Sequence, residues 1–149
     1  MQYLDALFDV LWEIKKLLWP ERAAMILERK LLQDESEYPL SDMSVLLELY
    51  QRTGDEVKAK AKYEGITAML RSMRTIVGPQ FAREHCYVLV RVAHFEANVL
   101  GDRELGRATA QRALTIARTH AVASVIELIR HDFPEVYASA FRNKVEPDP

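Results

Sequence analysis

Two places in the chain carry the same turn chemistry between runs of apolar residues at helical spacing. Gly54-Asp55 interrupts one such run, and Gly101-Asp102 interrupts another. Glycine adopts the left-handed backbone conformation that ends many helices, and aspartate caps the first turn of a following helix. Each place therefore predicts a unit of helix, tight turn and helix. A chain with two such units is constrained to an all-α fold built from helical hairpins.

Apolar periodicity along the rest of the chain extends this pattern to seven or eight helices. It predicts helices over residues 3–19, 20–33, 41–53, 56–76, 80–100, 103–118 and 120–131, and a short last helix from 132 to about 141. Ser41 is the expected N-cap of the third helix, and Gly78-Pro79 is expected to end the fourth. Residues 34–40 predict a loop, and residues 143–149 predict a disordered tail.

Length and composition fit one self-sufficient domain. The chain has 149 residues, of which 49% are hydrophobic and 28% charged, as is ordinary for a globular protein. We expect a single helical domain over residues 1–142, with an apolar N-terminal hairpin (1–33), repeat-like hairpins (41–120) and C-terminal helices (121–142). Cys86 is the sole cysteine, so no disulfide can form within the chain. This favours a reducing compartment, and we expect a cytoplasmic protein.

Neither a membrane nor a nucleic acid is an expected partner. Charged residues interrupt the apolar stretch over residues 1–19, and no uninterrupted stretch approaches the length that spans a bilayer. The net charge is −2, with six basic and twelve acidic side chains in residues 1–57 and fourteen basic and ten acidic ones after that. The arginines of residues 103–118 lack interleaved aromatic side chains, so no platform for stacking bases is predicted.

The sequence predicts neither an enzyme nor a metal or cofactor site. His85 and His94 lie nine residues apart, which places them on opposite sides of a helix. His120 and His131 could share a face, but no third metal ligand lies near them in sequence. Cys86 directly follows His85, so their side chains diverge on a helix and we expect a buried, unreactive thiol. No phosphate-binding glycine loop or nucleophile motif occurs.

The two hairpin units resemble tetratricopeptide repeats. The first carries the succession of leucine, tyrosine, turn, alanine and aromatic residue typical of that family, in Leu46, Tyr50, Gly54-Asp55, Ala59, Tyr63 and Ile66. The second has alanines in place of larger residues, in Ala93, Ala97, Gly101-Asp102, Gly106, Ala110, Ala113 and Leu114. The two turns lie 47 positions apart, against about 34 in the family. The chain thus looks like a short tetratricopeptide-like array, an α-α superhelix of degenerate repeats with long helices.

The resemblance implies a concave groove that holds a partner peptide or helix. Its groove-facing positions would be Ser44, Glu48, Gln51 and Arg52 in the first unit and Arg91, Phe95 and Asn98 in the second. Arg91 and Asn98 lie two helical turns apart and share a face, where they could hold a carboxylate. Phe95 would supply an apolar wall. The expected partner is a protein or peptide, and an acidic one would suit this face. In the alternative interpretation Phe95 belongs to the core and Arg91 is solvated.

The helix predicted over residues 3–19 carries apolar residues around most of its circumference. One stripe comprises Tyr3, Leu7, Val10, Ile14 and Leu17, and it is widened by Leu4, Phe8, Leu11, Trp12 and Leu18. Such a helix needs partners on two sides. It is therefore either sandwiched within the domain or part of an oligomer interface. In the second case Phe8, Trp12 and Trp19 would mediate self-association, with a homodimer as the expected assembly.

These observations favour a non-enzymatic interaction module, such as a scaffold or adaptor, that binds a partner segment in a helical groove. Two alternatives stay open. One is a regulatory sensor domain that closes around a small ligand or signalling peptide and changes its oligomeric state. The other is a protein that only self-assembles through its N-terminal hairpin.

Overall fold

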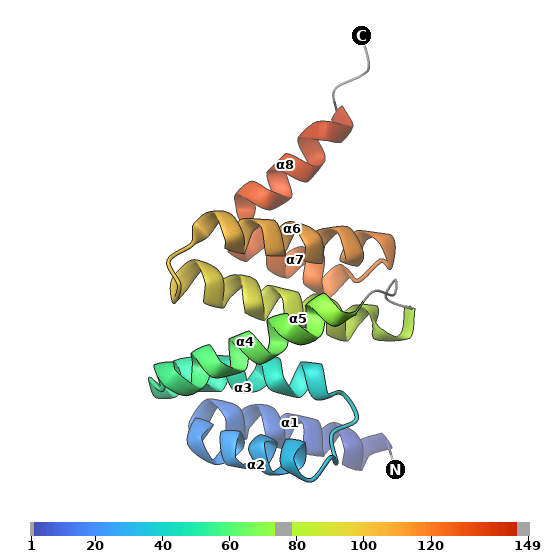
Figure 1. The fold of residues 1–149 in the computed structure, drawn as a ribbon. Helices are drawn as coiled ribbons and strands as arrows, with labels where there is room; N and C mark the ends of the chain where they lie inside the picture. Colours follow the sequence, from blue (N-terminus) through green and yellow to red (C-terminus); the bar gives the residue numbers. More distant parts are fainter. Residues whose placement is uncertain (1, 74–78, 146–149) are drawn as a thin grey trace. The chain divides into compact units, whose positions relative to one another are not determined.

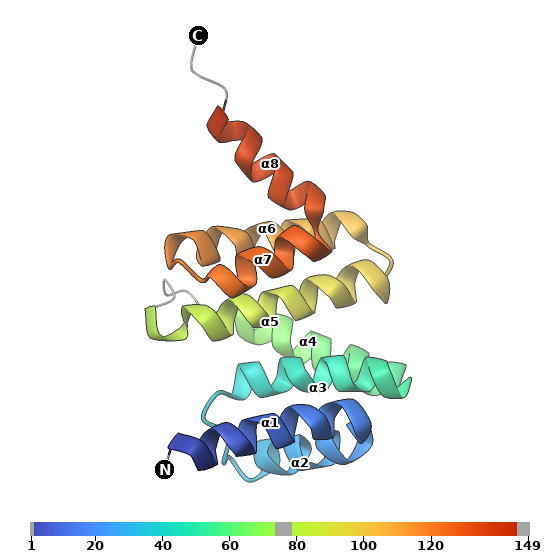
Figure 2. The ribbon, with the colours of Figure 1, turned by 180° about the vertical axis from the view of Figure 1, so that it is seen from behind.

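Eight helices make up most of residues 2–73 and 79–145, the parts of the chain that the computed structural model describes. No strand occurs in these two ranges. The predicted all-α class and the predicted number of helices are confirmed. Contacts divide the chain into two compact units, Met1–Ser72 (unit 1) and Met73–Pro149 (unit 2), drawn in Figures 1 and 2. The repeat-like region predicted over residues 41–120 is divided between them. The single domain over residues 1–142 and the tetratricopeptide-like assignment stay predictions.

Unit 1 is a succession of two helical hairpins. They comprise α1 (Gln2–Leu18), α2 (Pro20–Leu32), α3 (Pro39–Thr53) and α4 (Glu56–Ser72). Each helix packs against the next along the chain (Figure 1). The core of the unit lies between α2, α3 and α4, where Leu27, Leu46, Leu47, Leu49 and Ile66 are at most 2% exposed.

A three-residue cluster of polar side chains ties α2, α3 and α4 together. The hydroxyl of Tyr50 on α3 donates a hydrogen bond of 2.5 Å to Oε1 of Glu28 on α2. Nζ of Lys58 on α4 lies 3.7 Å from the same oxygen and 5.7 Å from the centre of the Tyr50 ring. Burial, followed by the bond to Glu28, raises the pKa of Tyr50 above its ordinary range, so the phenol stays a donor.

Unit 2 consists of α5 (Pro79–Asn98), α6 (Arg103–Thr119), α7 (Ala123–Asp132) and α8 (Pro134–Val145). The pair α5 and α6 forms its most extensive helix contact, and α7 packs against both of them (Figure 2). A Cβ atom added to Gly106 would lie 2.9 Å from the carbonyl oxygen of Ala93 and 3.0 Å from Cβ of Ala97. Small residues therefore let α5 and α6 approach closely.

The two Gly-Asp turns adopt the same local structure. Gly54 and Gly101 have φ angles of 76° and 69°, in the left-handed region. Oδ1 of Asp55 accepts a hydrogen bond of 3.1 Å from the amide of Lys58, and Oδ1 of Asp102 accepts one of 3.0 Å from the amide of Leu105. The predicted pairing of a left-handed glycine with a capping aspartate is confirmed at both places.

Several predicted helix boundaries differ from those of the structure by two or more residues. The predicted N-cap at Ser41 is wrong: α3 begins at Pro39, because proline presets the backbone of a first helical turn. Helix α4 ends at Ser72 rather than near residue 76; Gly78 lies outside the described residues. Helix α8 continues to Val145, three residues into the predicted tail, and residues 146–149 also lie outside the described ranges.

Candidate functional site

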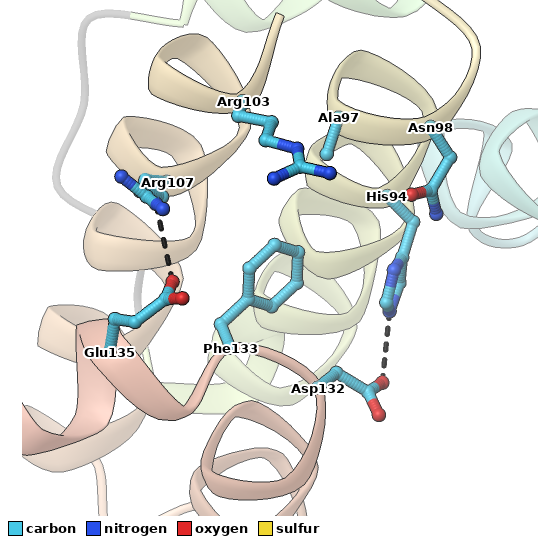
Figure 3. A pocket seen from close by; sticks show the side chains of 8 residues that line it. All are labelled: His94, Ala97, Asn98, Arg103, Arg107, Asp132, Phe133 and Glu135. Atoms are coloured by element: carbon cyan, nitrogen blue, oxygen red, sulfur yellow. Dashed lines mark hydrogen bonds and ion pairs between the residues drawn. The ribbon is translucent and has the colours of Figure 1, made fainter. Parts of the chain in front are cut away.

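A pocket of about 510 Å³ opens in unit 2 where α5, α6 and the junction of α7 with α8 meet. Figure 3 shows that its lining is contributed by side chains from all four helices and from the residue between α7 and α8. The lining residues are His94, Ala97, Asn98, Arg103, Arg107, Asp132, Phe133 and Glu135. Such a volume lies within the range of ordinary ligand pockets, about 300–1,000 Å³.

Arg103 owes its place at this pocket to the second Gly-Asp turn. The turn ends α5 at Asn98 and starts α6 at Arg103, with Asp102 as its N-cap. In Figure 3 the Arg103 side chain reaches from α6 across the pocket toward α5. Within residues 2–73 and 79–145 no carboxylate forms an ion pair with Arg103. Its guanidinium group therefore keeps donors available to a ligand.

The two carboxylates of the lining are both engaged by bases. Nε of Arg107 lies 3.2 Å from Oε2 of Glu135, and both side chains are exposed. Nε2 of His94 lies 2.9 Å from Oδ2 of Asp132, and Nδ1 of His131 lies 2.7 Å from Oδ1 of the same carboxylate. Because each acid already has a basic partner, a bound anion would face Arg103 without a competing carboxylate.

Asp132 is held in its ionised form. Its burial alone would raise its pKa, but hydrogen bonds from His131 and His94, together with their charges, outweigh that effect and lower the pKa. The Asp132 carboxylate in turn orients the His94 ring, whose centroid lies 5.0 Å from that of Phe133. The pocket thus combines a fixed His-Asp pair with an apolar wall from Phe133, which belongs to its lining.

Of the three site residues predicted on α5, the pocket includes only Asn98. Asn98 is exposed at the C-terminal end of α5 and belongs to the lining. Arg91 lies two turns earlier, outside the lining, with its guanidinium carbon 5.7 Å from the centre of the Tyr87 ring. The predicted groove position of Phe95 is wrong: it is 0% exposed, because α5 packs against both α6 and α7. Phe133 provides the apolar wall instead.

The four partner-binding residues predicted on α3 lie in unit 1. The groove position of Ser44 is wrong, since its side chain is 0% exposed and its hydroxyl donates a 2.7 Å hydrogen bond to the Ser41 carbonyl. Gln51 donates to the Leu47 carbonyl at 3.2 Å. Arg52 and Glu48 form an ion pair of 3.0 Å on the surface, and Arg52 also lies 3.5 Å from the Lys16 carbonyl. These contacts hold the polar side chains against their own unit.

Of the residues predicted to mediate self-association, Phe8 and Trp12 lie on the exposed helix α1, and Trp19 is the N-cap of α2. Phe8 and Trp19 are 65% and 52% exposed, and Trp12 is half-buried. The first stripe is exposed as well, in Tyr3, Leu7, Val10, Ile14 and Leu17. It is flanked by Leu4, Leu11 and Leu18, which are also at least 50% exposed. These eight residues are called the α1 stripe. No residue of 3–18 is buried, so α1 is not sandwiched within unit 1.

Asn98 is the one lining residue predicted from the sequence; the residues not predicted as part of a site are His94, Ala97, Arg103, Arg107, Asp132, Phe133 and Glu135. One signal was present: Arg103 directly follows the Gly-Asp turn that ends the helix carrying Asn98. No comparable signal links residues 132–135 to this place, because the packing of α7 against α5 and α6 brings them there.

Other kinds of site find little support in the parts of the chain that the structure describes. No group of three His, Cys, Asp or Glu side chains there could hold a metal ion. Cys86 is fully buried, and burial raises the pKa of its thiol to about 11, so the predicted buried thiol is confirmed. Among those same residues, no helix combines the length and apolar character needed to cross a bilayer.

The chain was compared with protein families, curated proteins and solved structures. No protein-family model, curated protein or solved structure matches the chain.

Proposed function

We propose that the chain is a non-enzymatic binding module that takes an acidic side chain of a partner peptide into the pocket of unit 2. The observation that carries this proposal is the Arg103 guanidinium, which extends into the pocket without an ion pair to any described residue. A guanidinium group pairs with a carboxylate through two parallel hydrogen bonds, and such charge-assisted bonds are among the stronger ones in proteins.

The remaining lining supports the same ligand. Asn98 lies at the end of α5, where its amide can donate a second hydrogen bond to a carboxylate. Phe133 and Ala97 supply an apolar surface for the methylene groups of an acidic side chain. The volume of about 510 Å³ accommodates one or two side chains of a peptide that runs over the surface.

A binding role is favoured over a catalytic one by the chemistry of the lining. His94 and Asp132 form a His-Asp pair, but the described lining contains no Ser, Thr or Cys that this pair could activate. We accordingly propose a scaffold or adaptor without a cofactor, working in the cytoplasm.

A small-ligand sensor is the second candidate. The pocket is large enough for a free dicarboxylate, and Arg103 would bind its carboxylate as it would bind a glutamate side chain. The two candidates therefore share one recognition chemistry and differ in whether the carboxylate belongs to a peptide or to a free small molecule.

Fluorescence anisotropy of labelled peptides tests the proposal on the full chain. The probe is a peptide pool with a central Glu-Glu pair, and the matched pool carries Gln-Gln. We expect Arg103→Gln to weaken binding of the Glu-Glu pool at least about 10-fold, in line with the loss of a charge-assisted pair. Arg112→Gln is the control: Arg112 is exposed on the same helix, nine residues later, and faces the opposite side.

Each outcome of this experiment decides between the candidates. Preference for Glu-Glu that Arg103→Gln removes and Arg112→Gln keeps supports the peptide module. Competition by free succinate, together with a succinate-dependent rise in melting temperature, favours the sensor. Equal binding of both pools, or an equal loss in both variants, contradicts the pocket assignment.

A further inference from the structure

We propose that two copies of this chain associate through the α1 stripe, with the two α1 helices antiparallel. This surface lies in unit 1 and is independent of the pocket in unit 2. Its eight side chains are between 41% and 91% exposed. At about 100° per residue they occupy a continuous arc of roughly 140° on α1.

The stripe faces away from the rest of unit 1. Helix α2 is the main neighbour of α1, and the half-buried residues of the C-terminal half of α1 are Trp12, Lys15 and Lys16. Trp12 and Lys16 lie on the opposite face of the helix from Leu7 and Ile14, and Lys15 lies at the edge of the stripe, beside Leu4 and Leu11. The apolar residues of α1 that α2 covers are therefore not those of the stripe.

The area of the stripe matches what a stable dimer needs. The eight side chains together expose apolar surface on the order of 900 Å², and a standard interface buries about 800 Å² on each partner. The largest apolar patch on an ordinary monomer is about 300–600 Å². An interface that buries most of the stripe would therefore approach the standard size.

The order of residues along α1 favours the antiparallel arrangement. Full overlap of two antiparallel stripes places Tyr3 opposite Leu18 of the second copy and puts the two-fold axis near Val10. The acidic residues Asp5 and Asp9 lie in the N-terminal half of α1, and Lys15 and Lys16 lie in its C-terminal half. Antiparallel copies therefore bring opposite charges to the same end of the helix pair.

A second copy fits this surface better than a membrane does. Amphipathic helices that lie on membranes carry mostly Lys and Arg on their polar face. The polar residues of α1 include Asp5, Asp9 and Glu13 beside its two lysines, and an anionic lipid surface would repel this face.

Sedimentation velocity of the full chain over a range of concentrations tests the proposal. We expect wild-type protein to be dimeric. Leu7→Lys should raise the dimer dissociation constant at least about 10-fold, because both copies would bring a lysine charge into the buried interface. Leu7 is 52% exposed, so the variant keeps its fold. Val57→Lys is the matched control, because Val57 is an exposed apolar residue of unit 1 on α4, outside the α1 stripe, and the change adds the same charge. Circular dichroism verifies that both variants are helical.

Crosslinking tests the orientation. In the Val10→Cys variant the new cysteine lies near the proposed two-fold axis, so a short bis-maleimide should link the two chains of a dimer through this position. Leu4→Cys should not be linked, because antiparallel copies place the two Leu4 positions about 20 Å apart along the helix axis. Wild-type protein supplies the background, since its Cys86 is fully buried.

Three results would overturn the proposal. The first is a wild-type chain that stays monomeric, and the second is a dimer unaffected by Leu7→Lys. The third is a monomer that binds phosphatidylcholine–phosphatidylserine vesicles through the stripe, which would assign α1 to a membrane surface. Crosslinking of both cysteine variants would exclude the antiparallel orientation.

Discussion

Nε of Arg107 lies 3.2 Å from Oε2 of Glu135, across the space between α6 and the first turn of α8 (Figure 3). This ion pair neutralises one of the two arginines of the pocket, while Arg103 has no such partner among the described residues. The difference between two arginines four residues apart follows from the position of α8. It determines which of them is available to an anionic ligand.

Removing the charge of Glu135 should strengthen binding of the Glu-Glu peptide pool. Glu135→Gln releases Arg107, so a second guanidinium group becomes available to a carboxylate. We expect a dissociation constant about 2- to 5-fold lower, because exposed pairs of this kind contribute at most about 1 kcal/mol. Anisotropy titration measures the change. Glu127→Gln is the control, since Glu127 pairs with Arg130 at 3.5 Å outside the lining. An equal gain in both variants would point to net charge rather than to the pocket.

Asp132→Asn should destabilise unit 2 near neutral pH but not in acid. Because the pKa of Asp132 is lowered in the folded chain, its ionised form stabilises the fold above the ordinary aspartate pKa, about 3.9. This stabilisation is lost as the pH falls through the lowered pKa. We expect a loss of about 1 kcal/mol in the free energy of unfolding at pH 6. Urea titrations at pH 6 and at pH 2.5 should show the difference shrinking, and an undiminished difference at low pH would contradict this origin.

Gly106→Ala should weaken the packing of α5 against α6. The new methyl group would lie 2.9 Å from the backbone oxygen of Ala93 and 3.0 Å from Cβ of Ala97, and neither atom can rotate away. We expect a loss of about 1–3 kcal/mol in unfolding free energy, measured by urea titration with circular dichroism.

Gly65→Ala provides the contrast within another helix. There the added methyl group would meet only Cε of Met43 at 3.2 Å, the end of a flexible side chain that can move. Alanine also favours a helix over glycine by about 1 kcal/mol. We expect this variant to be as stable as the wild type or up to about 1 kcal/mol more stable. An equal loss in both glycine variants would rule out the close helix crossing as the cause.

Tyr50→Phe should destabilise unit 1 by about 1–2 kcal/mol. The change removes the hydrogen bond to Glu28 and leaves that half-buried carboxylate with Lys58 alone. Tryptophan fluorescence during urea titration is a suitable measurement, since Trp12 and Trp19 are the two tryptophans of the chain and both lie in unit 1. Tyr3→Phe is the control, because Tyr3 is 91% exposed. Equal midpoints for Tyr50→Phe and wild type would contradict a stabilising role for this bond.

The candidate site was only partly predictable from the sequence. Asn98 was identified through the resemblance to tetratricopeptide repeats, and helical spacing puts it on the same face as Arg91. The resemblance also placed Phe95 in a groove, because a repeat pattern does not show on how many sides a helix is covered. Helices α6 and α7 both contact α5, and Phe95 is buried as a result.

The amino-acid sequence by itself determined the helices and the turns between them. Gly54 and Gly101 end helices because glycine tolerates positive φ, and Asp55 and Asp102 cap the next ones; these are interactions between residues a few positions apart. Only the tertiary structure decided which residues meet at the pocket, since Arg103 and Phe133 come together through the packing of separate helices. It also left the α1 stripe exposed, because α2 packs against another face of α1. Local chemistry fixes the elements, whereas burial depends on contacts between residues distant in sequence, which no local pattern encodes.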